Sequence, residues 1–283
     1  MSPSRKPNVA ELHRSNRSAW NEGAQAYENN LQSTIAFLKE GGVNLDPPEL
    51  LYLKDLSQWC KRAIHLQCAG GRDTLSLWNH GAEEVVGLDI SDRMIETARA
   101  TSEAVGARAL WYRCDVLEAP HELDSTADLV YTGRGALYWL MDISAWAKVV
   151  ERLLKPQGRL YIFEGHPLDW VWNEDAPTYQ IDFNPPLGDY FSQSINEGKG
   201  WSETYIPAKA VIPKDKQSRK YERQWTLGQI INSLIDAGLS MVRFEEHPGT
   251  FWNQFPNMPS DTCRRLPHTF SLLMQKKSCS NTL

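Results

Sequence analysis

Short apolar runs alternate with helical patterns along the second quarter of the chain. An apolar run around Ile64 leads into a glycine-containing turn at residues 69–71, and a helical pattern around Leu75 follows. A second apolar run over residues 85–88 then ends in the acid Asp89. This order of strand, turn, helix and strand predicts a βαβ unit with two parallel strands.

The same alternation continues toward the end of the chain. Further strands are expected, in chain order, at residues 127–131, 159–163, 241–246 and 270–275. A helix that ends near Gly158 separates the first two of these strands, and a helix over residues 227–237 precedes the last two. The last two strands are expected to complete the sheet as an antiparallel pair.

The regions on either side of this core are less regular. Residues 1–10 are expected to be disordered, whereas residues 11–30 and 49–59 each predict a helix. Residues 166–224 are rich in Trp, Tyr, Asp and Pro and show no helical period. A loop of this length inside a compact domain is usually functional, so we expect it to cover the substrate site. Its charged part, residues 214–223, is expected to be a solvent-exposed crossover.

The turn after the first strand has the composition of a nucleoside site. Gly70 and Gly71 let the backbone approach a ligand where a side chain would collide. Asp89, at the tip of the second strand, can accept hydrogen bonds from both hydroxyls of a ribose. The turn lacks the third glycine of the dinucleotide fingerprint, and the chain has no Gly-Lys-Ser/Thr phosphate loop. Dinucleotide and nucleoside triphosphate ligands are therefore disfavoured.

Three further segments extend this pattern over residues 60–165. They are Asp89-Ile90-Ser91 with Met94 behind it, Cys114-Asp115-Val116 after the third strand, and Leu153-Leu154-Lys155-Pro156-Gln157-Gly158 before the fifth. With the glycine turn, they make the chain resemble the class I S-adenosylmethionine (SAM)-dependent methyltransferases. The resemblance implies SAM as the cofactor. It also implies an α/β fold, a Rossmann-like doubly wound sheet of seven mostly parallel strands with helices on both faces, an N-terminal helical lid and an inserted cap after the fifth strand.

On this resemblance, the cofactor site is built from the turn, the strand ends and the N-terminal helix. The expected cofactor-binding residues are Trp20, Tyr27, Gln67, Cys68, Ala69, Gly70, Arg72, Asp73, Asp89, Ile90, Met94, Asp115, Val116, Thr132 and Gly133. Trp20 and Tyr27 are placed on the lid, although their helix could instead be an ordinary packing helix. The expected segments are residues 1–58 (lid), 59–165 (SAM-binding core), 166–224 (cap) and 225–283 (last helix and strands).

The first motif departs from the family pattern at three positions. His65 and Gln67 stand where the family usually has an acid and a glycine, and Ala69 replaces another glycine. Gln67 therefore indicates that the methionine end of the ligand is held by a different set of groups. Arg72 and Asp73 are candidates for charge-assisted contacts with the carboxylate and ammonium of the ligand. Alternatively, they only favour the start of the following helix.

Candidate catalytic residues lie at the carboxyl ends of the strands, where open α/β sheets bind ligands. They are His166, Tyr138, Tyr131 and Arg134. His166 is the best-placed general base because the unperturbed pKa of histidine lies near neutrality. Alternatively, it is a turn residue that bonds its own backbone before Pro167. Arg134 could bind an acidic group of the acceptor, or it could pair with Asp128 or Asp142.

Composition limits the partners and the compartment. The 283 residues carry a formal net charge of −5 with acids and bases interspersed, so a nucleic-acid partner is not expected. Five Cys without paired spacing, and no Cys-x-x-Cys or His-x-x-x-His, indicate neither a disulfide framework nor a metal site. No apolar stretch is long enough to span a bilayer, so we expect a cytoplasmic protein, and the family resemblance implies a small-molecule substrate. The oligomeric state is not readable.

Three roles remain compatible with a SAM site. Transfer of the methyl group to a small molecule is the main expectation. The altered first motif and the aromatic excess, which includes Trp139, Trp170, Trp172 and Trp201, would also suit transfer or cyclisation of the aminocarboxypropyl arm with release of methylthioadenosine. A non-catalytic SAM-binding protein is a further alternative, and a dehydrogenase lacks its glycine fingerprint.

Overall fold

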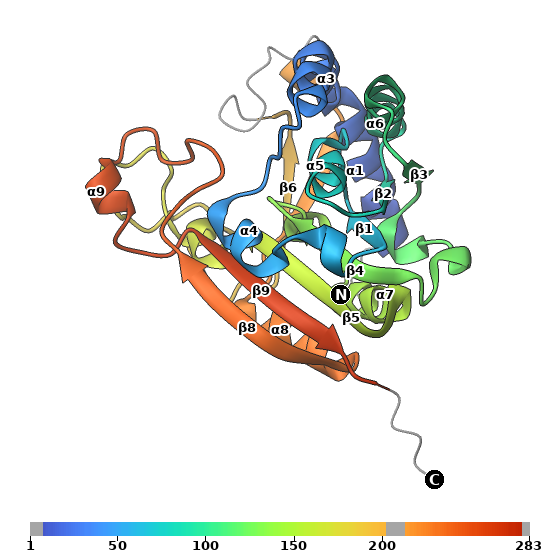
Figure 1. Cartoon of the computed structure of the whole chain (residues 1–283). Helices are drawn as coiled ribbons and strands as arrows, with labels where there is room; N and C mark the ends of the chain where they lie inside the picture. The colour runs from blue at the N-terminus through green and yellow to red at the C-terminus, as the bar shows by residue number, and fades with distance from the viewer. Residues whose placement is uncertain (1–7, 202–212, 279–283) are drawn as a thin grey trace.

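One seven-stranded sheet organises the computed structural model, which describes residues 8–201 and 213–278. The strand order is β3-β2-β1-β4-β5-β9-β8 (Figure 1). The strands are β1 (Arg62–Leu66), β2 (Glu84–Asp89), β3 (Ala109–Arg113), β4 (Ala127–Gly133), β5 (Leu154–Gly165), β8 (Leu239–His247) and β9 (Thr269–Lys276). β1 to β5 are parallel, whereas β9 runs antiparallel to both β5 and β8. This confirms the predicted Rossmann-like sheet, with the reversal of strand order between β1 and β4.

Helices cover both faces of the sheet because successive residues of each strand point to opposite sides. Ile64 and Leu66 of β1 pack with α7 and α8, whereas Ala63 packs in a second core with α4, α5 and α6. The helices are α1 (Val9–Gly23), α2 (Gln25–Asn29), α3 (Leu31–Lys39), α4 (Pro47–Leu53), α5 (Arg72–Asn79), α6 (Asp92–Val105), α7 (Ile143–Leu153), α8 (Leu227–Asp236) and α9 (Ser260–Cys263). The predicted two-faced arrangement is confirmed.

The N-terminal region is more helical than predicted. The single helix expected over residues 11–30 is instead α1 and α2, which meet at Ala24, and α3 follows directly. Asn8 starts α1 by accepting a hydrogen bond from the backbone N–H of Ala10 at 3.1 Å, so the expected disorder was wrong for residues 8–10. Residues 1–7 lie outside the described part of the chain.

The helix predicted over residues 49–59 is shorter than expected. α4 ends at Leu53 because Lys54 adopts a left-handed backbone with φ of 54°, and only a 3₁₀ turn, Leu56–Gln58, follows. At its start, Asp46 and Glu49 form a capping box on either side of two prolines. This box fixes the place of Glu49, which matters for the site.

The cap, residues 166–224, contains a two-stranded antiparallel ribbon that the sequence did not predict. Its strands are β6 (Ile195–Lys199) and β7 (Arg219–Arg223). The segment 214–223 is not the expected solvent-exposed crossover, because β7 packs against α1. The amide of Asn16 donates to the carbonyl of Tyr221 at 2.8 Å and accepts from its N–H at 2.7 Å.

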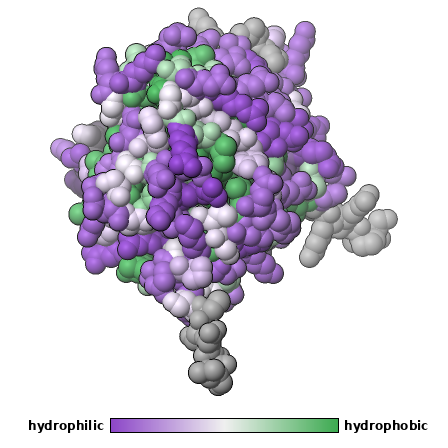
Figure 2. Space-filling model, turned by 45° about the vertical axis from the view of Figure 1, so that its right-hand side comes forward, coloured by the Kyte–Doolittle hydropathy of each residue, from purple (hydrophilic) through white to green (hydrophobic). Residues whose placement is uncertain are grey.

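The surface is mostly polar. Figure 2 shows one face on which hydrophilic residues predominate and apolar residues form small separate groups. Within residues 8–201 and 213–278, none of the helices combines the length and the hydrophobicity needed to cross a membrane.

The core predicts a clear stability difference between two apolar substitutions. Trp146 of α7 is 0% exposed, whereas Leu51 of α4 is 61% exposed. Trp146→Ala should lower the free energy of unfolding by about 3–5 kcal/mol, because it removes packing and leaves a cavity. Leu51→Ala should change it by less than about 0.5 kcal/mol. Chemical denaturation of both variants measures this, and equal losses would contradict the packing described.

Candidate functional site

The turn between β1 and α5 has an unusual backbone. Gln67, Ala69 and Gly71 all take left-handed conformations, with φ of 57°, 45° and 81°. A Cβ added at Gly71 would lie 2.6 Å from the ring of Trp111, and one added at Gly70 would lie 3.0 Å from the ring of Tyr27. Gly71 is therefore required by its backbone and by close packing, Gly70 is tightly packed, and the turn presents its backbone and the start of α5 to a cavity.

This first cavity is an open space of about 970 Å³, solvent at its mouth included, between the carboxyl ends of β1, β2, β3 and β4 and the N-terminal helices. The strand ends contribute Asp89, Asp115 and Gly133, and the N-terminal helices contribute Trp20 and Tyr27. The cavity therefore brings together residues that the sequence predicted from four separate segments.

Asp89 is poised to accept further hydrogen bonds in this cavity. Its carboxylate accepts from the N–H of Ala69 and from the N–H of Ser91, each at 2.8 Å. A carboxylate offers about four acceptor positions, so lone pairs remain for the hydroxyls of a ligand. Burial raises the pKa of Asp89 to about 6, although the backbone hydrogen bonds lower it.

Gln67 provides a second test of which ligand fits. Its side-chain amide donates to the carbonyl of Ala136 at 2.6 Å, whereas its Oε1 is buried and has no donor among the described residues. A buried acceptor without a partner is costly, so a ligand with a donor group fits here. A ribose and an ammonium, both present in SAM, match Asp89 and Gln67, and these residues therefore fit this cofactor.

His13 fastens the N-terminal helix α1 over the cavity. Its Nε2 accepts from the N–H of Met141 at 3.2 Å, so its Nδ1 carries the proton and donates to Asp115 at 2.6 Å. Asp115 also accepts from the N–H of Leu117 at 3.0 Å. His13 is 4% exposed. This buried link gives α1 a defined position at the edge of the cofactor cavity.

An aromatic cluster lies beside this link. The ring of Trp20 on α1 is 5.0 Å from that of Trp139 and 4.4 Å from that of Trp201. The ammonium of Lys220 on β7 lies over two of these rings, 5.7 Å from the centroid of Trp139 and 4.8 Å from that of Trp201. Segments from the N-terminus, the core and the cap therefore meet at one aromatic surface.

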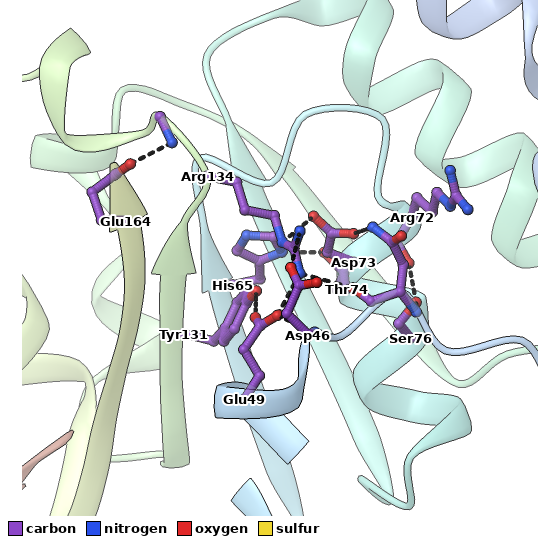
Figure 3. Close-up of polar contacts among 12 residues, drawn as sticks. Asp46, Glu49, His65, Arg72, Asp73, Thr74, Ser76, Tyr131, Arg134 and Glu164 are labelled. Atoms are coloured by element: carbon purple, nitrogen blue, oxygen red, sulfur yellow. Dashed lines mark hydrogen bonds and ion pairs between the residues drawn. The ribbon is translucent and has the colours of Figure 1, made fainter. Parts of the chain in front are cut away.

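Arg134, at the end of β4, is held by carboxylates of its own chain. Its guanidinium pairs with Glu49, with Asp46 at 3.0 Å and with Asp73 at 3.5 Å, and these groups point toward one another (Figure 3). Asp73 also accepts from the amide of Asn44 at 2.5 Å. Burial raises the pKa of Glu49 to about 7, although Arg134 opposes the rise. Neither Asp128 nor Asp142 is its partner, so that expectation was wrong.

Most of the residues expected to bind the cofactor line the first cavity. They are Trp20, Tyr27, Gln67, Cys68, Ala69, Gly70, Arg72, Asp73, Asp89, Ile90, Asp115, Val116 and Gly133. Met94 and Thr132 are not among the lining residues. Met94 is fully buried, and Thr132 donates its hydroxyl to the carbonyl of Leu66 at 3.2 Å.

The four catalytic candidates are not gathered at one place. Arg134 lines the first cavity, whereas Tyr131 is fully buried and donates its hydroxyl to Glu49. His166 accepts the N–H of Leu168 on Nδ1 at 3.0 Å and contacts Glu246 through Nε2 at 2.9 Å, and it lines neither this cavity nor the second one. Burial lowers the pKa of His166. Tyr138 lines the second cavity and donates to the carbonyl of Gly165 at 2.8 Å.

Sequence reasoning missed several residues of the site. His13, Asn16 and Glu49 gave no local signal, because their partners are distant in the sequence. Trp139 was noted only as part of the aromatic excess, yet it lines both cavities. His65, at the departing position of the motif, bonds Thr74 at 2.8 Å, and burial lowers its pKa to about 4. His65 therefore stays neutral beside the turn.

A second cavity of about 1290 Å³ adjoins the first. The two share Gly135 and Trp139 in their walls. The rest of the second wall comes from the end of β5, from the cap and from residues 250–254. In the described part of the chain, no group of three or more His, Cys, Asp and Glu is arranged to hold a metal ion.

Comparisons with known proteins agree with this geometry. A family model described as a methyltransferase domain matches residues 63–158. A SAM-dependent methyltransferase structure from Mesorhizobium loti superposes with a TM-score of 0.55 and 23% identity, covering 81% of this chain and 96% of that one. A structure from Listeria monocytogenes, titled as a methyltransferase of the same kind, gives a TM-score of 0.58 and 19% identity, covering 81% and 98%. Residues 63–158 therefore match a methyltransferase domain, the fold is shared with SAM-dependent methyltransferase structures, and these matches indicate SAM as the cofactor.

Curated relatives match a smaller part of the chain. A ubiquinone biosynthesis O-methyltransferase from Neisseria meningitidis is 27% identical over 150 residues, 50% of this chain and 61% of that protein. A demethylmenaquinone methyltransferase from Lactococcus lactis is 26% identical over 168 residues, 59% of this chain and 60% of that protein. The chain thus spans about three fifths of the length of these two relatives.

Asp89 predicts both the affinity for the nucleoside and its dependence on pH. Asp89→Asn should weaken binding of S-adenosylhomocysteine by about 10- to 100-fold, because hydrogen bonds to a charged acceptor are lost. Since the pKa of Asp89 is about 6, wild-type affinity should fall as the pH is lowered through 6. Calorimetric titration at several pH values measures both effects.

The matched control for Asp89 is Asp236→Asn, which changes an exposed carboxylate on α8. This control should bind as the wild type does and keep its pH dependence, whereas Asp89→Asn should lose the pH dependence. Wild-type affinity in Asp89→Asn would contradict the placement of the ribose.

His13 predicts a change in the rate at which the ligand leaves. His13→Ala removes the bond from α1 to Asp115, so S-adenosylhomocysteine should dissociate about tenfold faster if a buried charge-assisted bond is lost. Stopped-flow tryptophan fluorescence can measure the rate. An unchanged dissociation rate, with the fold intact by circular dichroism, would show that α1 does not retain the ligand.

Proposed function

We propose that the protein transfers the methyl group of SAM to a small-molecule acceptor bound in the second cavity. The observation that carries this proposal is the meeting of the two cavities at Gly135 and Trp139. The first fits the cofactor, and the second offers a separate space for another molecule. Two adjoining sites are what a transfer between two small molecules requires, because the reacting groups must be held close and aligned.

The cofactor side of this proposal assigns roles to residues of the first cavity. Bound SAM supplies a methyl group on a positively charged sulfur. Asp89 would hold the ribose, Gln67 would accept from a donor of the methionine end, and Asp115 would lie near the base. Arg72, at the start of α5, lies over the ring of Phe37 at 4.5 Å and faces the same cavity. It would attract the carboxylate of the ligand.

The acceptor side depends on enclosure more than on a dedicated base. Tyr138 and Trp170 pack with ring centroids 5.2 Å apart in the wall of the second cavity. The cap and Trp139 close the space between the two ligands and would exclude water from the reacting atoms. The curated relatives are named for methyl transfer in quinone biosynthesis, which supports a small acceptor.

The deciding experiment is incubation of the full chain with SAM, with and without a panel of small amines, phenols and quinols. We expect S-adenosylhomocysteine to form only with an acceptor, whose mass rises by one methyl group in mass spectrometry. Methylthioadenosine formed from SAM alone would instead show attack on the aminocarboxypropyl arm. Tight SAM binding without turnover across the panel would favour a non-catalytic role.

A further inference from the structure

The wall of the second cavity combines aromatic rings with carboxylates. Trp170, Trp172 and Trp252 supply rings, and Asp169, Asp182 and Glu222 supply acids. Asp169 is only 4% exposed, and the side chain of Glu222 is 21% exposed. Two more acids, Glu174 and Asp175, lie in the same wall. A wall of this composition suits a ligand that aromatic faces and negative charges both attract.

The positive charges in this wall do not balance the acids. Among the described lining residues, Lys220 and His268 are the basic groups that face five carboxylates. His268 pairs with Asp169, because its Nδ1 contacts that carboxylate at 2.6 Å. The ammonium of Lys220 lies 3.8 Å from the carboxylate of Glu222, so it neutralises this acid only weakly. Burial raises the pKa of Glu222, which is the response of a carboxylate without enough positive charge nearby.

Two further observations indicate that the wall suits a polar, positively charged ligand. The ammonium of Lys220 already lies over Trp139, the residue that both cavities share, so this surface holds a cation against an aromatic ring. The Nε1 of Trp172 is buried and has no acceptor among the described residues. A guest that carries an oxygen would satisfy this N–H.

From these contacts we infer that the acceptor is a cationic amine carrying an aromatic or apolar body, and that nitrogen receives the methyl group. This inference rests on the proposed function and names its substrate class. The acceptor ammonium first loses a proton to a carboxylate of the wall or to water. Its nitrogen then forms the N–CH₃ bond while the S–CH₃ bond breaks and the bonding electron pair stays on sulfur. The products are an N-methylammonium and the neutral thioether.

The direction in which charge moves favours nitrogen over a phenolic oxygen. In this reaction the positive charge leaves the first cavity and arises in the second, where the acids stabilise it as it develops. A phenol would instead have to ionise to an anion among five carboxylates, and like charges oppose that ionisation. The wall therefore discriminates between the two acceptors by charge.

Three probes that share one phenol ring test this inference. They are tyramine (cationic), 4-ethylphenol (neutral) and 3-(4-hydroxyphenyl)propionate (anionic). Calorimetric titration into the full chain saturated with S-adenosylhomocysteine should show tyramine binding about tenfold or more tightly than 4-ethylphenol, and the propionate most weakly. With SAM, tandem mass spectrometry of the tyramine product should place the methyl group on nitrogen.

A pair of isosteric variants locates the effect in the wall. Glu222→Gln should reduce the preference for tyramine over 4-ethylphenol several-fold. Asp182→Asn should have the same effect, and it provides the test should Glu222→Gln disturb β7. Glu103→Gln, on the exposed face of α6, should keep the preference of the wild type.

The results separate the inference from the proposed function. Equal or tighter binding of 4-ethylphenol or the propionate, or methylation of the tyramine oxygen, would overturn the amine assignment and leave a methyltransferase in place. Binding of S-adenosylhomocysteine is measured first, without a probe. Its absence would overturn the proposed function, and titration of the three probes into the unliganded chain would then still report the charge preference of the second cavity.

Discussion

A buried guanidinium sets the geometry at the carboxyl end of β4. Arg134 can stay in that position only because Glu49, Asp46 and Asp73 surround it, since an uncompensated buried charge is strongly destabilising. These partners come from α4, from the residue before it and from α5. The network therefore joins three elements next to the glycine turn, and Arg134 and Asp73 line the first cavity. The glycine turn, the loop after β4 and the floor of the first cavity share this support.

The parts of the fold that follow from local pattern were readable from the sequence. Ile64 and Leu66 before a glycine turn, and Asp89 after a second apolar run, are signals contained in a few neighbouring residues. They led to the βαβ unit and to the sheet. They also led to a set of candidate residues, most of which line one cavity. Local periodicity suffices for such features because each residue is constrained by its own element.

The rest of the site depends on contacts between distant segments. Glu49 is 85 residues from Arg134, and His13 is 102 residues from Asp115, so no local pattern marks either pair. β7 was read as a solvent-exposed segment because its residues are charged, but Asn16 of α1 completes its hydrogen bonds. Arg134 was expected to bind an acidic group of the acceptor. The residues next to it in the sequence gave no sign of the carboxylates that pair with its guanidinium. In each of these cases, contacts between distant segments determined where the residue lies.

The contact between α1 and β7 also has a consequence for the order in which the protein forms during synthesis. Ser15 donates to the carbonyl of Arg219 across 204 positions, and Glu22 accepts from Ser218 across 196. α1 is therefore synthesised well before β7, the strand against which it docks. Domains generally form as units while the chain emerges, N-terminal parts first. Here α1, which lies beside the first cavity, can complete its packing only after β7 has been made.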